Sequence, residues 1–298
     1  MRTLLRETLL GDRTSCRDWS MLWFMPEGDT LHLIARRMQP LVGQALRAFA
    51  LPRSTQPTGH LVGKRLEAVE ARGKNLLVTF EGAWVLHTHL RMNGAWRVRA
   101  RASGEPARLP AGSVVYLATD THEALCTNAP SVTLARRGSL RLDPLRSLGP
   151  DLLADPVDLG ALAKRLRGAE EIALGVAVMD QRLVSGIGNV WKSDGLFACG
   201  LDPFSPVARF TDEELRALLA HVRSAMVANV DGTAHRRALV PARSGRRVTR
   251  FEPGGSRMGP AVYERARQPC RRCSTPIERT MQGTRSTYAC PRCQPRRA

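Results

Sequence analysis

Apolar residues recur with two different periods along this chain. Over residues 29–41 they follow the spacing of a helix that Asp29 or Thr30 can cap. From residue 64 onward, short apolar runs are separated by Gly-Lys, Glu-Gly and Asn-Gly pairs, which are typical of hairpin turns. This pattern predicts strands at residues 65–71, 75–80, 83–90, 95–99, 113–118 and 131–135. The first half is therefore expected to be an antiparallel β-sandwich with flanking helices.

The helical period returns in the second half of the chain. Residues 143–156 are punctuated by proline and glycine and predict a linker. Helices are expected at 158–166, 170–179, 189–198 and 211–230, the last of which opens with a Thr211–Glu214 capping box. A basic loop and a cysteine-rich end follow. The chain is therefore expected to be an α+β multidomain protein with the segments 1–25, 26–142, 143–156, 157–234, 235–260 and 261–298.

The charge balance favours an acidic polymer as the partner. Lys and Arg number 45 against 27 Asp and Glu, which gives a formal net charge of +18 at pH 7. Nucleic acid is the first candidate for so basic a chain. No apolar run reaches the roughly 20 residues that span a bilayer, so no membrane partner is expected. A GC-rich genome favours arginine codons and explains most of the arginine excess, but each of the four lysines is worth examining: Lys64, Lys74, Lys164 and Lys192.

Four of the seven cysteines have the spacing of a metal site. They form two Cys-x-x-Cys pairs, Cys270 with Cys273 and Cys290 with Cys293. Two such pairs at the ends of a short hairpin supply four thiolates and close the coordination shell, which indicates one structural Zn²⁺. Two disulfides or a coincidental spacing are the alternatives. The remaining cysteines are scattered, as expected for reduced thiols in the cytoplasm: Cys16, Cys126 and Cys199.

Five segments in order along residues 25–298 carry further motifs. They are Pro26-Glu27-Gly28-Asp29-Thr30, Arg72-Gly73-Lys74-Asn75-Leu76-Leu77, His89-Leu90-Arg91-Met92-Asn93-Gly94, Asp180-Gln181 with Gly186-Ile187-Gly188-Asn189, and the two cysteine pairs with Arg285 between them. Together they resemble the formamidopyrimidine-DNA glycosylase and endonuclease VIII family. The Pro-Glu-Gly-Asp-Thr start is closer to endonuclease VIII.

The resemblance implies a fold and an activity. The β-sandwich would be followed by a helix–two-turn–helix domain and a C-terminal zinc-finger β-hairpin. The implied activity is that of a bifunctional DNA glycosylase and AP lyase of base excision repair, which excises oxidised bases, here expected to be pyrimidines, and cuts the abasic site by β,δ-elimination. Its partner would be damaged double-stranded DNA, and the protein would be a cytoplasmic, nucleoid-associated monomer.

Three catalytic residues follow from the matching motifs. A proline at a chain start is a secondary amine with a pKa near 7.7–8.0, so Pro26 could attack C1′ of a deoxyribose and form an iminium. Glu27 would move protons during opening of the sugar and elimination. Lys74 would place its ammonium on a phosphate or on the leaving base. The structural alternatives are a proline in a first helical turn, a helix-dipole complement and an exposed turn lysine.

Five further residues are expected to contact DNA. Gly186 and Gly188 would let backbone amides approach a phosphate at a helix start, and Asn189 would add a side-chain donor. Arg285 would bind a phosphate through two parallel hydrogen bonds from its planar guanidinium. Met92 would fill the space left by a flipped nucleotide. Helix caps explain the glycines equally well, and a buried core methionine is the alternative for Met92.

Two residues depart from the family pattern, and one segment puts the chemistry in question. Asp194 stands where Glu is frequent, and Glu264 stands in place of the usual Gly. The nitrogen of an internal proline is a tertiary amide and cannot be a nucleophile. We therefore expect residues 1–25 to be a mis-assigned extension and the chain to begin at Met25, whose removal frees Pro26. The alternatives are a catalytically dead zinc-containing DNA-binding protein, if Met1 is the start, or an 8-oxoguanine-directed glycosylase.

Overall fold

A computed structural model of the chain describes residues 26–101, 109–232 and 260–297. The extension at residues 1–25 and nearly all of the predicted basic loop at 235–260 lie outside these described residues. The chain divides into two compact units. Of the described residues, the N-terminal unit comprises Pro26 and those of 31–143, and the C-terminal unit comprises Glu27–Thr30 and those of 144–298. None of the helices in the described segments is long and apolar enough to cross a membrane.

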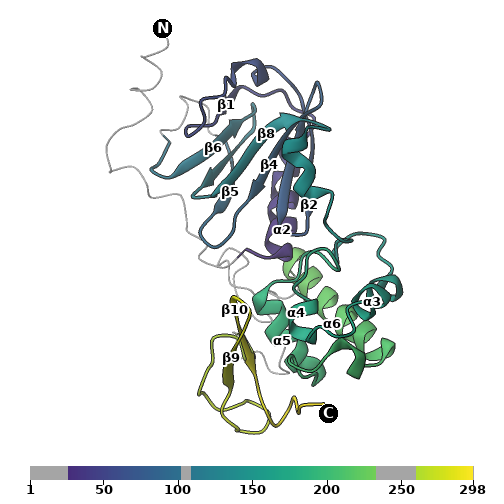
Figure 1. Cartoon of the computed structure of the whole chain (residues 1–298). Helices are drawn as coiled ribbons and strands as arrows, with labels where there is room; N and C mark the ends of the chain where they lie inside the picture. The colour runs from purple at the N-terminus through teal and green to yellow at the C-terminus, as the bar shows by residue number, and fades with distance from the viewer. Residues whose placement is uncertain (1–25, 102–108, 233–259, 298) are drawn as a thin grey trace. The chain divides into compact units, whose positions relative to one another are not determined.

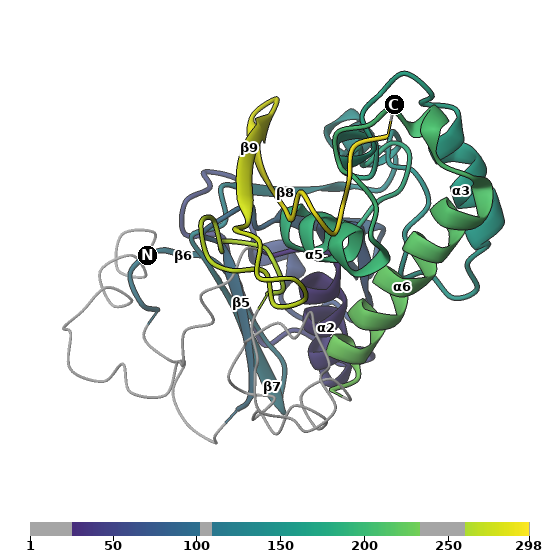
Figure 2. The same cartoon turned by 90° about the horizontal axis from the view of Figure 1, so that it is seen from below.

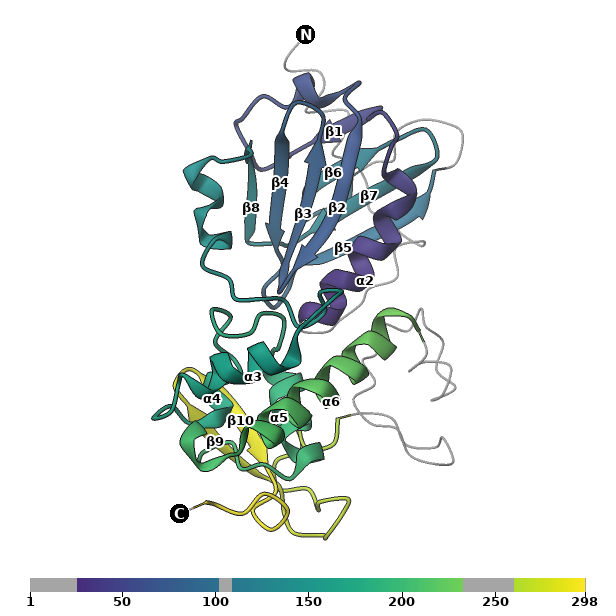
Figure 3. The ribbon, with the colours of Figure 1, turned by 90° about the vertical axis from the view of Figure 1, so that its right-hand side faces the viewer.

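Two four-stranded antiparallel sheets form the N-terminal unit (Figure 1). The first has the order β2-β3-β4-β8, with bounds Leu66–Arg72, Asn75–Phe80, Trp84–His89 and Ser131–Arg136. The second has the order β1-β6-β7-β5, with bounds Ala48–Ala50, Ser113–Ala118, His122–Thr127 and Ala95–Ala100. Helix α2 (Gly28–Met38) lies alongside the sheets, as Figure 3 shows. The predicted antiparallel sandwich with a leading helix is confirmed.

One hydrophobic core is shared by α2 and both sheets. Leu31 and Met38 of the helix are fully buried, together with Leu66 and Leu86 of one sheet and Val115 of the other. Each buried aliphatic side chain contributes about 1.5–3 kcal/mol. The cluster therefore holds the helix and the two sheets together as one unit.

The sequence pattern missed two strands of the sandwich, β1 and β7. Strand β7 begins with His122 and Glu123, which look like solvent-facing residues in the sequence. Glu123 is nevertheless buried, because its carboxylate accepts a hydrogen bond from Tyr116 Oη at 2.7 Å and another from Arg99. A paired carboxylate inside a sheet interrupts the apolar pattern without interrupting the strand.

In the described part of the C-terminal unit, four α-helices form the body, and Figure 2 shows two of them, α3 and α6, side by side. Their bounds are Leu159–Arg167 for α3, Leu174–Ala177 for α4, Asn189–Cys199 for α5 and Asp212–Val230 for α6. The predicted capping box at the start of α6 is present, with Thr211 Oγ1 accepting from Glu214 N and Glu214 accepting from Thr211 N. Helix α5 is buried along nearly its whole length and packs on α6.

Two stretches differ from the helices and linker that the pattern predicts. Only one helical turn, α4, forms within 170–179, because the carbonyls of Glu170 and Ile172 accept hydrogen bonds from Ala208 N and Val207 N instead of from the helix. Within residues 143–156, the side chain of Leu152 is fully buried in the helical core, and its amide donates to Ser185 O at 3.1 Å. That segment is packed against the helices.

A two-stranded antiparallel hairpin ends the chain. Strand β9 (Glu278–Gln282) pairs with β10 (Arg285–Ala289) across a turn in which Gly283 has φ +58°. Helix α5 packs against β10. Strand β10 is therefore exposed at its beginning, where Arg285 lies, and buried in its second half.

Candidate functional site

Glu27 lies at the amino end of α5. Its side chain is 2% exposed, and its carboxylate oxygens accept hydrogen bonds from Val190 N at 2.9 Å and Trp191 N at 3.3 Å. The adjacent amide of Gly28 donates to Gly186 O at 2.9 Å. A carboxylate at this position complements the positive end of the helix dipole. Glu27 is therefore fixed in one orientation, directly after Pro26, which is itself buried.

The glycines before α5 make room for this carboxylate. A Cβ atom on Gly188 would lie 2.1 Å from Glu27 Cδ, and a Cβ atom on Gly28 would lie 2.8 Å from Gly186 Cα. Two amides of the helix start, which were candidates for a phosphate, bond to Glu27 instead. The structure thus gives Gly186 and Gly188 a packing role, and their contact with a phosphate stays a prediction.

Gln181 is a site residue to which the sequence analysis assigned no role. Its Nε2 donates to Ile187 O at 3.0 Å, and its Oε1 accepts from Gly186 N at 3.0 Å. These two bonds hold the turn on which Gly28 docks. In the sequence, Gln181 was visible only as part of the Asp180-Gln181 pair of the fourth motif. Spacing alone does not predict that its side chain bonds to the turn at Gly186, five residues later.

Replacing Gly188 by alanine is expected to displace Glu27. The added Cβ would overlap a carboxylate that is itself held by two amides, and overpacking of this kind costs about 1–3 kcal/mol. We expect Gly188→Ala to lower the unfolding midpoint and to reduce strand cleavage at an abasic site strongly. Gly59→Ala is the matched control, because a Cβ there meets nothing within 4 Å. Equal cleavage by the two variants would place Glu27 outside the reaction.

Asn189 and Arg285 belong to the same unit as Glu27. Asn189 is buried, and its Nδ2 donates to Ser286 O of β10 at 2.8 Å. Arg285, one residue earlier, is exposed at the beginning of β10. Within the described part of the chain its guanidinium has no ion pair, so it is available to an external anion. The hydrogen bond of Asn189 therefore ties the start of α5 to the strand that carries Arg285.

Lys74 and Met92 belong to the N-terminal unit. Lys74 lies in the turn between β2 and β3, where Asn75 Nδ2 donates to Arg72 O at 3.0 Å and His87 Nε2 donates to Asn75 Oδ1 at 2.8 Å. Burial lowers the pKa of His87 to about 4, so this imidazole stays neutral beside the turn at pH 7. Met92 is 53% exposed, which excludes the alternative of a core methionine. Its wedge role stays a prediction.

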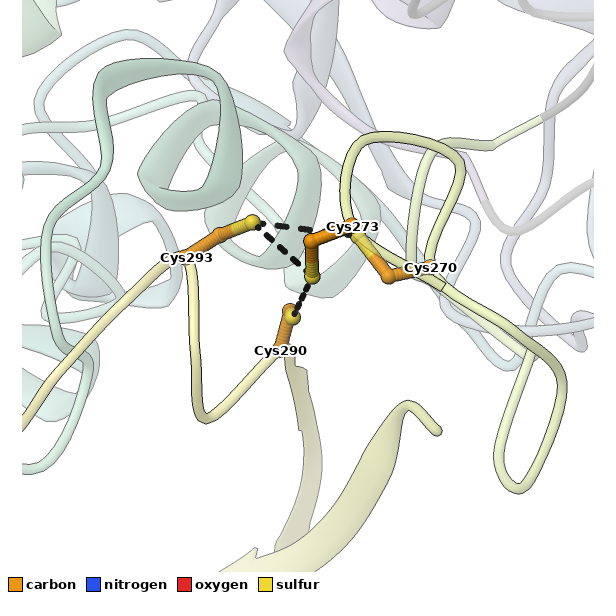
Figure 4. Close-up of side chains that lie close together, drawn as sticks. All are labelled: Cys270, Cys273, Cys290 and Cys293. Carbon is orange, nitrogen blue, oxygen red and sulfur yellow. Dashed lines mark hydrogen bonds between the residues drawn. The ribbon is translucent and has the colours of Figure 1, made fainter. Parts of the chain in front are cut away.

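The four cysteines of the two pairs come together at the base of the hairpin (Figure 4). All four Sγ atoms lie within 4.8 Å of one another; Cys270 and Cys293 are 3.9 Å apart and Cys273 and Cys290 are 3.5 Å apart. Tetrahedral zinc with bonds of about 2.3 Å places its sulfurs about 3.8 Å apart. The thiols are free, so the disulfide alternative is wrong, and the cluster fits one zinc ion.

The cysteine cluster is anchored to the far end of α5. Arg272, between the first two cysteines, donates to Phe197 O and Ala198 O, both at 3.0 Å. Gln294, after the last cysteine, donates to Leu201 O at 2.8 Å. The zinc hairpin is thus bonded to the beginning of α5 through Asn189, and to the end of α5 and the residues just after it through Arg272 and Gln294.

Three family models match the chain. The formamidopyrimidine-DNA glycosylase N-terminal domain matches residues 25–134, the formamidopyrimidine-DNA glycosylase H2TH domain matches 148–238, and a zinc finger found in FPG and IleRS matches 267–296. The last match covers all four clustered cysteines and confirms the predicted structural zinc site.

Curated relatives match nearly the whole chain. A protein named "Probable endonuclease 8 2" from Streptomyces coelicolor is 36% identical over 91% of this chain and 94% of its own length. "DNA-(apurinic or apyrimidinic site) lyase Nei2" of Mycolicibacterium smegmatis is 32% identical over 91% and 99%. Among solved structures, MutM (FPG) of Thermus thermophilus is 29% identical, covers 90% of this chain and 98% of that chain, and has a TM-score of 0.67. The structure of a Lactococcus lactis FPG mutant in complex with Fapy-dG-containing DNA is 18% identical, covers 91% of this chain and 100% of that chain, and has a TM-score of 0.68. At this identity the similarity supports the fold only.

Proposed function

The chain belongs to the formamidopyrimidine-DNA glycosylase and endonuclease VIII family, and from this premise we propose that it is a bifunctional DNA glycosylase and AP lyase of base excision repair. The observation that carries the proposal is the anchoring of Glu27, directly after Pro26, on the start of α5. That contact holds Glu27 on the unit that also carries Arg285 and the zinc hairpin.

The proposed reaction uses the secondary amine of Pro26 as its nucleophile. The nitrogen forms a bond to C1′ of the damaged nucleotide while the bond from C1′ to the base breaks, and the base leaves with the electron pair of that bond. The C1′–O4′ bond of the sugar then breaks as O4′ takes up a proton, which leaves an iminium between C1′ and the Pro26 nitrogen. This iminium acidifies the C2′ protons, so elimination expels the 3′ phosphate and then the 5′ phosphate. Glu27 is the group that moves protons, because it lies next to Pro26 in the chain. Lys74 is assigned to a phosphate or to the leaving base.

Damaged double-stranded DNA is the proposed substrate, with the chromosome of the nucleoid as its source. Asn189 and Arg285 are assigned to phosphates, and Met92 to the space left by the flipped nucleotide. Zinc, held by Cys270, Cys273, Cys290 and Cys293, supplies no chemistry to the reaction and stabilises the hairpin that presents Arg285.

Oxidised pyrimidines are the proposed lesions. The Pro-Glu-Gly-Asp-Thr motif and the relative named endonuclease 8 in Streptomyces coelicolor support this choice. The test compares excision from otherwise identical duplexes that carry thymine glycol, 8-oxoguanine or no lesion. We expect the highest kcat/KM on thymine glycol. Faster release of 8-oxoguanine would favour the purine-directed alternative, and tight binding without excision of either base would favour a catalytically dead DNA-binding protein.

Binding to DNA is expected to be mainly electrostatic. About six phosphate contacts would give log K a slope of roughly −5 against log salt. We expect Arg285→Ala to flatten that slope by about one unit and to weaken binding to damaged and undamaged duplexes alike. Arg47→Ala is the control, because it removes the same charge from an exposed ion pair with Asp120. A slope that Arg285→Ala leaves unchanged would place this guanidinium away from the DNA backbone.

A further inference from the structure

Lys192 is a buried cation for which the proposed reaction has no use. It lies in α5, is 2% exposed, and belongs to the largest fully buried side chains of the described residues. Its Nζ donates to Thr287 Oγ1 at 2.7 Å and contacts Ser286 O at 3.4 Å. Burial of an ammonium is costly unless its protons find acceptors, so these contacts determine where the Lys192 side chain lies.

The acceptors of Lys192 are the two residues that follow Arg285. Ser286 O also accepts from Asn189 Nδ2, so two side chains of α5 converge on one carbonyl of β10. Thr287 Oγ1 in turn donates to Gln282 Oε1 at 2.7 Å, across the hairpin. The network therefore reaches both strands of the hairpin, on either side of the turn next to Arg285.

The other end of this network rests on the helical body of the C-terminal unit. Gln282 Nε2 donates to Pro203 O at 2.9 Å, in the segment that follows α5. Both strands are thus bonded to the helical body: β10 through Asn189 and Lys192, and β9 through Gln282. Thr287 stands at the junction and is fully buried.

An apolar side chain of similar length could fill the space of Lys192 without the cost of burying charge. Replacement of buried ionic groups by packed apolar ones is frequently neutral or stabilising, so packing alone does not call for a lysine here. What an ammonium adds is directed donors, aimed at the backbone next to the exposed arginine. Donors in this arrangement can set the position of strand β10 relative to α5.

We propose that Lys192 is a positioning residue that fixes β10 so that Arg285 faces the phosphate it binds. The proposal rests on the proposed function, because the phosphate contact of Arg285 is part of that function. Lys192 does not touch DNA itself, since its side chain is buried. Its effect on DNA binding is exerted through Arg285.

The test measures the salt dependence of binding to a duplex that carries a tetrahydrofuran abasic analogue. In the full chain, Lys192→Met and Thr287→Val are combined, since removing both partners leaves neither the ammonium nor the hydroxyl buried without the other, while Gln282 keeps its bond to Pro203 O. We expect the slope of log K against log salt to flatten by about one unit, as for Arg285→Ala. Lys164→Met, an exposed lysine of α3, is the charge-matched control and should leave the slope unchanged.

A double-mutant cycle separates positioning from general damage to the hairpin. If Lys192 acts through Arg285, adding Arg285→Ala to the Lys192→Met, Thr287→Val protein weakens binding by less than about twofold. Zinc content should stay at one ion per chain, and unfolding should stay cooperative. Full additivity with Arg285→Ala, or a wild-type salt slope in the folded variant, would overturn the proposal.

Failure of this inference is distinguishable from failure of the proposed function. If the wild-type protein excises lesions while the altered chain keeps the wild-type slope, only the role of Lys192 is overturned. If the wild-type protein binds DNA but excises nothing, the proposed function fails, and the salt slopes still report on how Lys192 and Arg285 are coupled.

Discussion

A chain that begins at Pro26 is expected to be trapped covalently on abasic duplex DNA by borohydride, whereas a chain that begins at Met1 is expected to leave the DNA unmodified. Only a free secondary amine can form the iminium that borohydride reduces, and the nitrogen of an internal proline carries an acyl group. Translation from Met25 exposes Pro26 once the initiator methionine is removed. The first family model also begins at residue 25. The adduct is measured by its slower migration in a denaturing gel.

Two comparisons decide whether Pro26 makes the attack. Pro26→Gly keeps an amine at the chain start but changes a secondary amine to a primary one, and we expect a weaker adduct. The mass of the mature N-terminus must show Pro26 as the first residue in the active sample. Equal trapping by the chain that begins at Met1 would assign the attack to a lysine, with Lys74 as the first candidate.

Loss of zinc is expected to unfold the hairpin and to abolish specific binding to DNA. Structural zinc contributes about 10–16 kcal/mol in zinc-finger peptides, more than two five-residue strands can supply alone. We expect Cys290→Ser to release the metal and to free Arg272 and Gln294 from the end of α5. Metal analysis, amide exchange in β9 and β10, and DNA affinity would report the loss.

The matched control for the zinc prediction is Cys199→Ser. Cys199 is a free, half-buried cysteine outside the cluster, so zinc content and DNA affinity should be unchanged. If Cys290→Ser loses its zinc and still binds DNA with wild-type affinity, the hairpin does not contribute to the interface.

The metal cluster and most of the sandwich could be predicted from local sequence, whereas the contacts that organise the site could not. Glycine and asparagine turns mark hairpins within a few residues, and Cys-x-x-Cys spacing marks a knuckle in the same way. The partner of Glu27 lies 163 residues away, and no local pattern records such a pairing. The only signal for Lys192 in the sequence was that it is one of four lysines in an arginine-rich chain.

The two departures from the family pattern have physical explanations in the structure. Asp194 is buried and its carboxylate accepts hydrogen bonds from Ala261 N, Val262 N and Tyr263 N at 2.7–3.0 Å, so the shorter acid still holds this segment. Glu264 has φ +57°, a left-handed conformation in which glycine carries no steric penalty. The glycine usual at this position is thereby accounted for, and Glu264 adopts the same conformation with some strain.

The contact between Glu27 and the start of α5 also sets an order of events during synthesis. The amides of Val190 and Trp191, which donate hydrogen bonds to the Glu27 carboxylate, leave the ribosome long after Pro26 does. Until then the nascent chain lacks the helix end that anchors the carboxylate next to Pro26, the proposed nucleophile. A fragment that ends before residue 190 contains every strand of the two four-stranded sheets and is nevertheless expected to remain inert toward DNA.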